Sequence, residues 1–210
     1  MRLPDIPTHA LGVAGIGGPV IFTVLVIVQG VLQPDYSHVQ MPISALAAWP
    51  LGWVQELNFA VLGVSQIAFA LGLHRAVRPG KSANQGGAGA ALIAMGGVGV
   101  LVAGAFSWKM VGGVPTETPP HVVGAITAFA STGLGFMRIS NRLAADAAWK
   151  DLALYTRVTG GAVLVLFLAL GFLAVDPGTP LNPWAGLLQR VLCLVWFSCV
   201  IVLSRRVMHR

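Results

Sequence analysis

Six runs of mainly apolar residues, each about long enough to cross a lipid bilayer, constrain this chain more than any other feature. A helix needs roughly 20 such residues to span a hydrocarbon core about 30 Å thick. The runs cover residues 10–33, 53–74, 87–110, 120–141, 154–175 and 183–204. Segments rich in proline and glycine separate them, and neither residue continues a helix at low cost. The sequence therefore predicts an all-α integral membrane protein, in which residues 1–210 form a single domain of six transmembrane helices.

The composition excludes the other broad classes of protein. Hydrophobic residues make up 56% of the chain and charged residues only 10%, whereas a soluble domain carries about 25% charged residues. Disorder requires low hydrophobicity and high charge density, and two cysteines in 210 residues cannot form a disulfide scaffold. The first apolar run is too long for the core of a signal peptide, so we expect it to be retained as a helix.

Lysine and arginine are distributed unequally between the two sides that the six runs define. One side holds eleven of the 13 basic residues: Arg2, Arg75, Arg78, Lys81, Arg138, Arg142, Lys150, Arg157, Arg205, Arg206 and Arg210. The other side holds Lys109, and Arg190 lies within the sixth run. Cytoplasmic loops carry this excess in multi-pass proteins, so we expect both termini in the cytoplasm. Topology also explains the net charge of +6, and we expect no nucleic-acid partner.

The fourth run has one helical face made of small or polar residues. At spacings of three and four, this face carries His121, Gly124, Ala125, Ala128, Ser131, Thr132 and Gly135. Small residues let helix backbones approach closely inside lipid, where no hydrophobic force drives helices together. We therefore expect this face to point into the bundle.

Polar and ionisable residues are concentrated at one depth of the predicted bundle. Four separate segments supply them to the outer half of the membrane: Asp35, His38, Ser44, Glu56, Asn58, His121, Gln189 and Arg190. The inner half is nearly free of such groups, apart from terminal Arg and Lys. This distribution predicts an outer polar chamber that binds a lipid head group or a small amphiphile, with Arg190 and His121 facing an anionic head group.

Arg190 is the most demanding of these residues, because it lies roughly 12 Å along its helix from the outer start at 1.5 Å per residue. It could extend its side chain to the interface, form a structural ion pair, or bind a ligand. Inward rotation and a carboxylate partner are the least costly solutions, since arginine does not deprotonate. We therefore expect Arg190 to face the interior, with Glu56 as first partner and His121 or Asn58 nearby.

Two further residues allow a structural and a chemical interpretation. Residues 42–50 are apolar and bounded by prolines, which predicts a short interfacial helix in the first outer loop, with the hydroxyl of Ser44 capping free amide groups. A nucleophilic Ser44 is the alternative. His121 is either a hydrogen-bonded structural histidine or a metal ligand, general base or head-group contact.

The sequence leaves three classes of function open. A non-enzymatic protein that binds membrane lipid is the first. An intramembrane hydrolase or transferase is the second, with His121 as base and a carboxylate from Glu56 or Asp35. A small transporter or accessory subunit is the third, and a homo-oligomer or a larger membrane complex is compatible with each class. The chain has no HExxH, CxxC or acidic metal motif, so we expect no metal or cofactor.

The order of several short motifs resembles that of a prokaryotic membrane family described as domain of unknown function 998. These motifs are Tyr36 with Pro42-Ile43-Ser44 after the first run, Asn58 in the second, His121 at the start of the fourth, and Gly186-Leu187-Leu188-Gln189-Arg190 in the sixth. In that family the serine is commonly followed by an acidic residue, whereas Ala45 stands here. If that acid has a role, Glu56 could supply it. The resemblance implies a six-helix protein of a prokaryotic inner membrane and carries no established activity.

Overall fold

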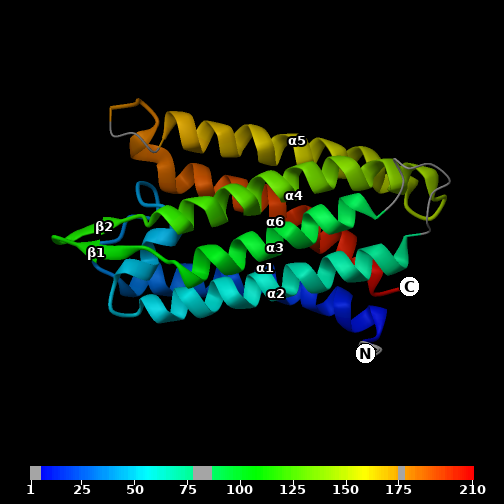
Figure 1. Ribbon diagram of the computed structural model, residues 1–210, viewed down its shortest axis with the longest axis horizontal. Helices are drawn as coiled ribbons and strands as arrows, with labels where there is room; N and C mark the ends of the chain where they lie inside the picture. Colours follow the sequence, from blue (N-terminus) through cyan, green and yellow to red (C-terminus); the bar gives the residue numbers. More distant parts are fainter. Residues whose placement is uncertain (1–5, 78–86, 175–177) are drawn as a thin grey trace.

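Six long helices run side by side in the computed structural model, which describes residues 6–77, 87–174 and 178–210 (Figure 1). Their bounds are α1 Thr8–Leu32, α2 Gly52–Ala76, α3 Ala88–Ala105, α4 Pro119–Ala145, α5 Lys150–Leu173 and α6 Ala185–Val207. All six are long and apolar enough to cross a membrane. The predicted all-helical, six-span architecture is confirmed within this part of the chain.

The third predicted span is wrong at its outer end, because α3 stops at Ala105 and does not reach residue 110. The chain instead forms a hairpin of strands β1 (Lys109–Val111) and β2 (Val114–Thr116). Gly112 and Gly113 form its turn with φ of 57° and 83°. Two consecutive left-handed residues suit a tight hairpin turn, and glycine adopts them without steric cost.

The bundle has two distinct ends. The β1–β2 hairpin lies at one end, which we call the hairpin end, and the start of α1 and the end of α6 lie at the other, which we call the termini end (Figure 1). Along the bundle α2 packs between α1 and α3, and α4 packs between α3 and α5. Helix α6 packs against α1, α2 and α5, so the first and last helices of the chain lie side by side.

Close backbone contact joins α3 to α4. A Cβ atom built on Gly99 would lie 2.4 Å from the backbone nitrogen of Ala128, and one built on Gly124 would lie 2.6 Å from that of Ala103. His121, Gly124, Ala128, Thr132 and Gly135 of the predicted small-residue face are buried, and Ala125 and Ser131 are partly so. The prediction that this face points into the bundle is confirmed.

The loop between α1 and α2 folds onto the hairpin end and contains a short 3₁₀ helix, η1 (Ile43–Ala48). The side chains of Ile43 to Ala47 are buried, and η1 packs against α1, α2 and α6. The predicted capping role of Ser44 is wrong, because η1 begins after Pro42 without a side-chain cap. Ser44 is instead buried within η1, at 6% exposure.

Buried polar groups also occur away from the hairpin end, contrary to expectation. The amide of Gln66, in the middle of α2, donates to the carbonyl of Ile93 at 3.0 Å and to the hydroxyl of Thr132 at 2.8 Å. At the termini end, the buried Arg142 donates to the carbonyls of His74 and Val77, which end α2. Each of these buried polar groups has hydrogen-bond partners inside the bundle. A hydropathy profile of the sequence does not reveal such pairs.

Candidate functional site

A pocket of about 570 Å³ opens between α4, α5 and α6 at the hairpin end. We call it the α4–α5–α6 pocket. Its polar lining comes from Gln40, Ser44, Trp108, Glu117, His121, Asn182 and Gln189. Its apolar lining includes Val122, Ala125, Ile126, Phe129, Phe167, Leu168 and Phe172.

The two kinds of lining lie at different depths. Helix α4 starts at the hairpin end, so Phe129 lies roughly 12 Å deeper along it than His121. Helix α5 approaches the hairpin end from the other direction, and Phe167 therefore lies deeper than Phe172. The pocket is thus polar near the hairpin end and apolar toward the middle of the bundle.

A second cavity of about 40 Å³ lies further inside the bundle. It shares Ser44, His121, Ala125, Phe129 and Gln189 with the α4–α5–α6 pocket, and its other lining residues are mainly apolar. A volume of about 10–15 Å³ already holds a water molecule. The polar residues between the α4–α5–α6 pocket and this inner cavity are therefore Ser44, His121 and Gln189.

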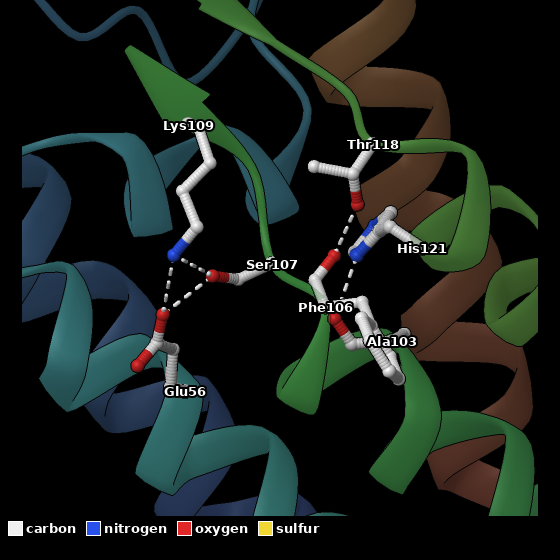
Figure 2. Close-up of polar contacts among 7 residues, drawn as sticks. All are labelled: Glu56, Ala103, Phe106, Ser107, Lys109, Thr118 and His121. Atoms are coloured by element: carbon white, nitrogen blue, oxygen red, sulfur yellow. Dashed lines mark hydrogen bonds and ion pairs between the residues drawn. The ribbon is translucent and has the colours of Figure 1, made fainter.

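His121 is held in one orientation by the end of α3. Its Nδ1 lies 2.7 Å from the carbonyl oxygen of Ala103, and its side chain is almost fully buried (Figure 2). Because a carbonyl only accepts hydrogen bonds, Nδ1 carries the proton. The hydroxyl of Thr118 similarly donates to the carbonyl of Phe106 at 2.5 Å. Both side chains satisfy carbonyls that the end of α3 leaves without helical partners.

This arrangement leaves Nε2 of neutral His121 as a hydrogen-bond acceptor. Nε2 lies 3.8 Å from a carboxylate oxygen of Glu117, which precedes α4. The Glu117 side chain is one-third exposed, and burial raises its pKa above the usual range. Two acceptors, a carboxylate and an imidazole nitrogen, therefore face each other at the polar end of the pocket.

Arg190 is half-buried between α6 and the loop after α1, and its partners are neutral groups. It donates to the hydroxyl of Tyr36 at 2.7 Å, to Nδ1 of His38 at 3.0 Å, and to the carbonyls of Gly186 and Met41 at 2.9 and 3.3 Å. The predicted Arg190–Glu56 ion pair and the neighbourhood of His121 and Asn58 are wrong. The loop after α1 folds across the start of α6 and offers its own acceptors to the guanidinium.

We call Tyr36, His38 and Arg190 the loop clasp. Two more bonds reinforce it, from the backbone nitrogen of Leu187 to the carbonyl of Val39 at 2.9 Å, and from that of Ile43 to Oε1 of Gln189 at 2.5 Å. A Cβ atom on Gly186 would lie 2.3 Å from the carbonyl oxygen of Met41. The glycine therefore lets the loop lie directly on α6, which places Ser44 in the pocket wall.

Glu56 belongs to a third group, separate from the pocket. The hydroxyl of Ser107 donates to its carboxylate at 2.5 Å, and Nζ of Lys109 lies 3.5 Å from the same oxygen (Figure 2). Figure 2 shows this group and the His121 group on either side of the segment that leaves α3. The Glu56–Lys109 pair is largely exposed, and such pairs contribute at most about 1 kcal/mol.

The remaining two predicted residues also lie outside the pocket lining. The amide of Asn58 is fully buried and donates to the carbonyl of Phe22 at 3.1 Å, which joins α2 to α1. Asp35 is exposed in the turn after α1. Of the eight predicted residues, three therefore line the pocket: Ser44, His121 and Gln189. Two others, His38 and Arg190, belong to the loop clasp.

Sequence reasoning missed Glu117 and the phenylalanines as lining residues. The spacing of Glu117, four residues before His121, offered a signal, since this distance matches one helical turn. No signal in the sequence identified Phe129 and Phe167, because apolar residues in a membrane span are expected on every face. Within the described residues, no three His, Cys, Asp or Glu side chains are placed to hold a metal ion.

Comparison with known proteins relates the chain to a family. A family model described as protein of unknown function (DUF998) matches residues 16–206, which is most of the chain. No curated protein and no solved structure matches it.

Proposed function

The chain belongs to the DUF998 family, and we propose that it is a multi-pass membrane protein that binds a single-chain amphiphile in the α4–α5–α6 pocket. The observation that carries this proposal is the graded lining of the pocket. Glu117, His121 and Ser44 lie near the hairpin end, and Phe129 and Phe167 lie toward the middle of the bundle. A volume of about 570 Å³ is typical of sites that enclose a small organic ligand.

The hairpin end faces the outside in this proposal, and both termini lie in the cytoplasm of a prokaryotic cell. The basic residues support this orientation. Arg75, Arg142, Lys150 and Arg206 belong to helix ends at the termini end, whereas Lys109 is on the hairpin. The ligand then enters from the outer leaflet or from the space beyond it.

The polar end of the pocket determines which amphiphile binds. An alkyl chain that leaves the bilayer for an apolar pocket gains little from the hydrophobic effect, because lipid tails are as apolar as the pocket wall. Hydrogen bonds and charge at the head group must therefore supply most of the selectivity. The α4–α5–α6 pocket concentrates its polar side chains where a head group would lie.

Native mass spectrometry of the protein, purified in a mild detergent, tests this proposal. Gly171 lines the pocket, and a Cβ atom built there meets nothing within 4 Å, so Gly171→Phe would fill the pocket without a backbone clash. Gly161, on the same helix, is equally open and does not line the pocket. We expect a co-purifying amphiphile in the wild type and in Gly161→Phe, and its loss in Gly171→Phe. Equal occupancy in both variants would overturn the proposal.

An intramembrane lipid-modifying enzyme is a second candidate, and one observation favours it. The bond from Nδ1 of His121 to Ala103 leaves Nε2 as a free base in the pocket that Ser44 also lines. Such a base activates a hydroxyl nucleophile when the two lie within hydrogen-bond reach of each other. Release of a cleaved or transferred product from bound lipid, abolished by Ser44→Ala in a folded protein, would establish this activity.

A further inference from the structure

The charged groups near the polar end of the α4–α5–α6 pocket are distributed unevenly. Glu117 lines the pocket, and among the lining residues that the structure describes none is lysine or arginine. Two basic side chains at the hairpin end, Lys109 and Arg190, are engaged elsewhere. Lys109 contacts Glu56 and Ser107, and Arg190 is held in the loop clasp. An ionised Glu117 therefore makes the polar end negative.

His121 contributes a hydrogen-bond acceptor to the same end of the pocket. The Nδ1 proton of His121 is used by Ala103, so Nε2 accepts. Trp108 adds an aromatic ring beside Glu117 in the pocket lining, with its centroid 6.4 Å from that of His121. The electron-rich face of an indole ring attracts cations. The Glu117 carboxylate and Nε2 of His121 together suit a positively charged donor.

We propose that the amphiphile carries an ammonium head group, which pairs with Glu117 and donates to Nε2 of His121 while its alkyl chain extends toward Phe129 and Phe167. This inference rests on the proposed function and names its ligand class. It replaces the sequence-based expectation of an anionic head group, since that expectation needed Arg190 beside His121. An anionic head group at this position would face the carboxylate of Glu117 without a compensating basic side chain in the lining.

Three ligands of equal chain length test the proposal: dodecylamine, dodecanol and dodecyl phosphate. Binding to the protein in a non-ionic detergent is measured by native mass spectrometry and by competition between pairs of ligands at pH 7, where the amine is protonated. We expect dodecylamine to bind on the order of tenfold more tightly than dodecanol, the factor that one hydrogen bond to a charged group supplies. Dodecyl phosphate should bind most weakly.

Glu117→Gln removes the charge and keeps the shape, and it should reduce the affinity for dodecylamine to about that for dodecanol. Glu56→Gln is the matched control, because Glu56 is a carboxylate of similar exposure at the same end and lies outside the pocket lining. Its affinities should equal those of the wild type.

The outcomes separate the two proposals. If the three ligands bind equally and Gly171→Phe abolishes binding, the ammonium proposal is wrong and the amphiphile site stands. If Gly171→Phe leaves binding of every ligand unchanged, both are wrong. Unchanged dodecylamine affinity in Glu117→Gln, or an equal loss in Glu56→Gln, would also overturn the ammonium proposal.

Discussion

Arg190 on α6 donates a hydrogen bond to Nδ1 of His38, 3.0 Å away, although the two residues are 152 positions apart in the chain. Arginine can only donate, so Nδ1 accepts and must be unprotonated. His38 also packs on α1, where a Cβ atom on Gly30 would lie 2.3 Å from its ring. Protonation of His38 would therefore remove this acceptor and place a second positive charge beside Arg190.

The stability of the protein should consequently fall in mild acid. Burial and the nearby Arg190 lower the pKa of His38, so the unfolded chain binds this proton more readily than the folded one. The contribution of neutral His38 to the stability of the fold is complete above about pH 6.5, the ordinary histidine pKa. It is lost as the pH falls through the lower pKa of His38 in the folded state. We expect His38→Gln to flatten this part of the pH profile of the thermal midpoint in detergent. The exposed His9→Gln is the control, and an unchanged profile in His38→Gln would contradict the argument.

Arg190 and Glu56 should be energetically independent. Replacing Arg190 by leucine removes its hydrogen bonds to Tyr36 and His38 and should cost about 1.5–3 kcal/mol, the range for a bond to a charged group. Glu56→Gln should cost at most about 1 kcal/mol. Because these residues share no partner, the double variant should equal the sum to within roughly 0.5 kcal/mol. Unfolding titrations of the single and double variants measure this, and a large interaction energy would contradict the separation.

The same cycle with Tyr36→Phe should give a different result. The Tyr36 hydroxyl accepts from Arg190 at 2.7 Å. Residues in one hydrogen-bond network show interaction energies of about 0.5–3 kcal/mol. We therefore expect Arg190→Leu and Tyr36→Phe to be non-additive, and strict additivity would argue against the loop clasp.

The contact between α3 and α4 should not tolerate an added methyl group. A Cβ atom at Gly99 would lie 2.4 Å from the backbone nitrogen of Ala128, so Gly99→Ala forces the helices apart. Overpacking of this kind costs about 1–3 kcal/mol. Gly161→Ala, on open α5 surface, is the matched control and should be neutral or slightly stabilising, because alanine favours helices. Thermal midpoints in detergent compare the two, and equal midpoints would be the contrary result.

Labelling of single cysteines tests the orientation. The native Cys193 and Cys199 are buried, so the wild type provides a low background. A cysteine at the exposed Val114, on the hairpin, should react in intact cells with a reagent that does not cross membranes. A cysteine at the exposed Ala145, at the termini end, should react only with a permeant reagent. The reverse pattern would place the hairpin in the cytoplasm.

Much of the architecture was accessible from the sequence. Six apolar runs separated by proline and glycine predicted six spans, because a bilayer imposes a minimum helix length and leaves no room for unpaired backbone. The spacing of Gly124, Ala128 and Thr132 predicted which face of α4 packs inward, since helical period relates sequence to face. Helical periodicity also predicted an inward-facing His121, and its side chain is buried in the structure.

The sequence by itself determined the number of spans, their inward faces and the residues that burial makes costly, while the tertiary structure decided which of those residues meet. Helical period says how a side chain points on its own helix, but not how a non-periodic loop folds. The loop after α1 provides the acceptors of the Arg190 hydrogen bonds, and Lys109 of the hairpin pairs with Glu56. Glu117 and His121 therefore lie together in a pocket whose described lining contains no basic side chain. The sequence did not predict this arrangement, because loop folding and helix packing depend on contacts between distant segments.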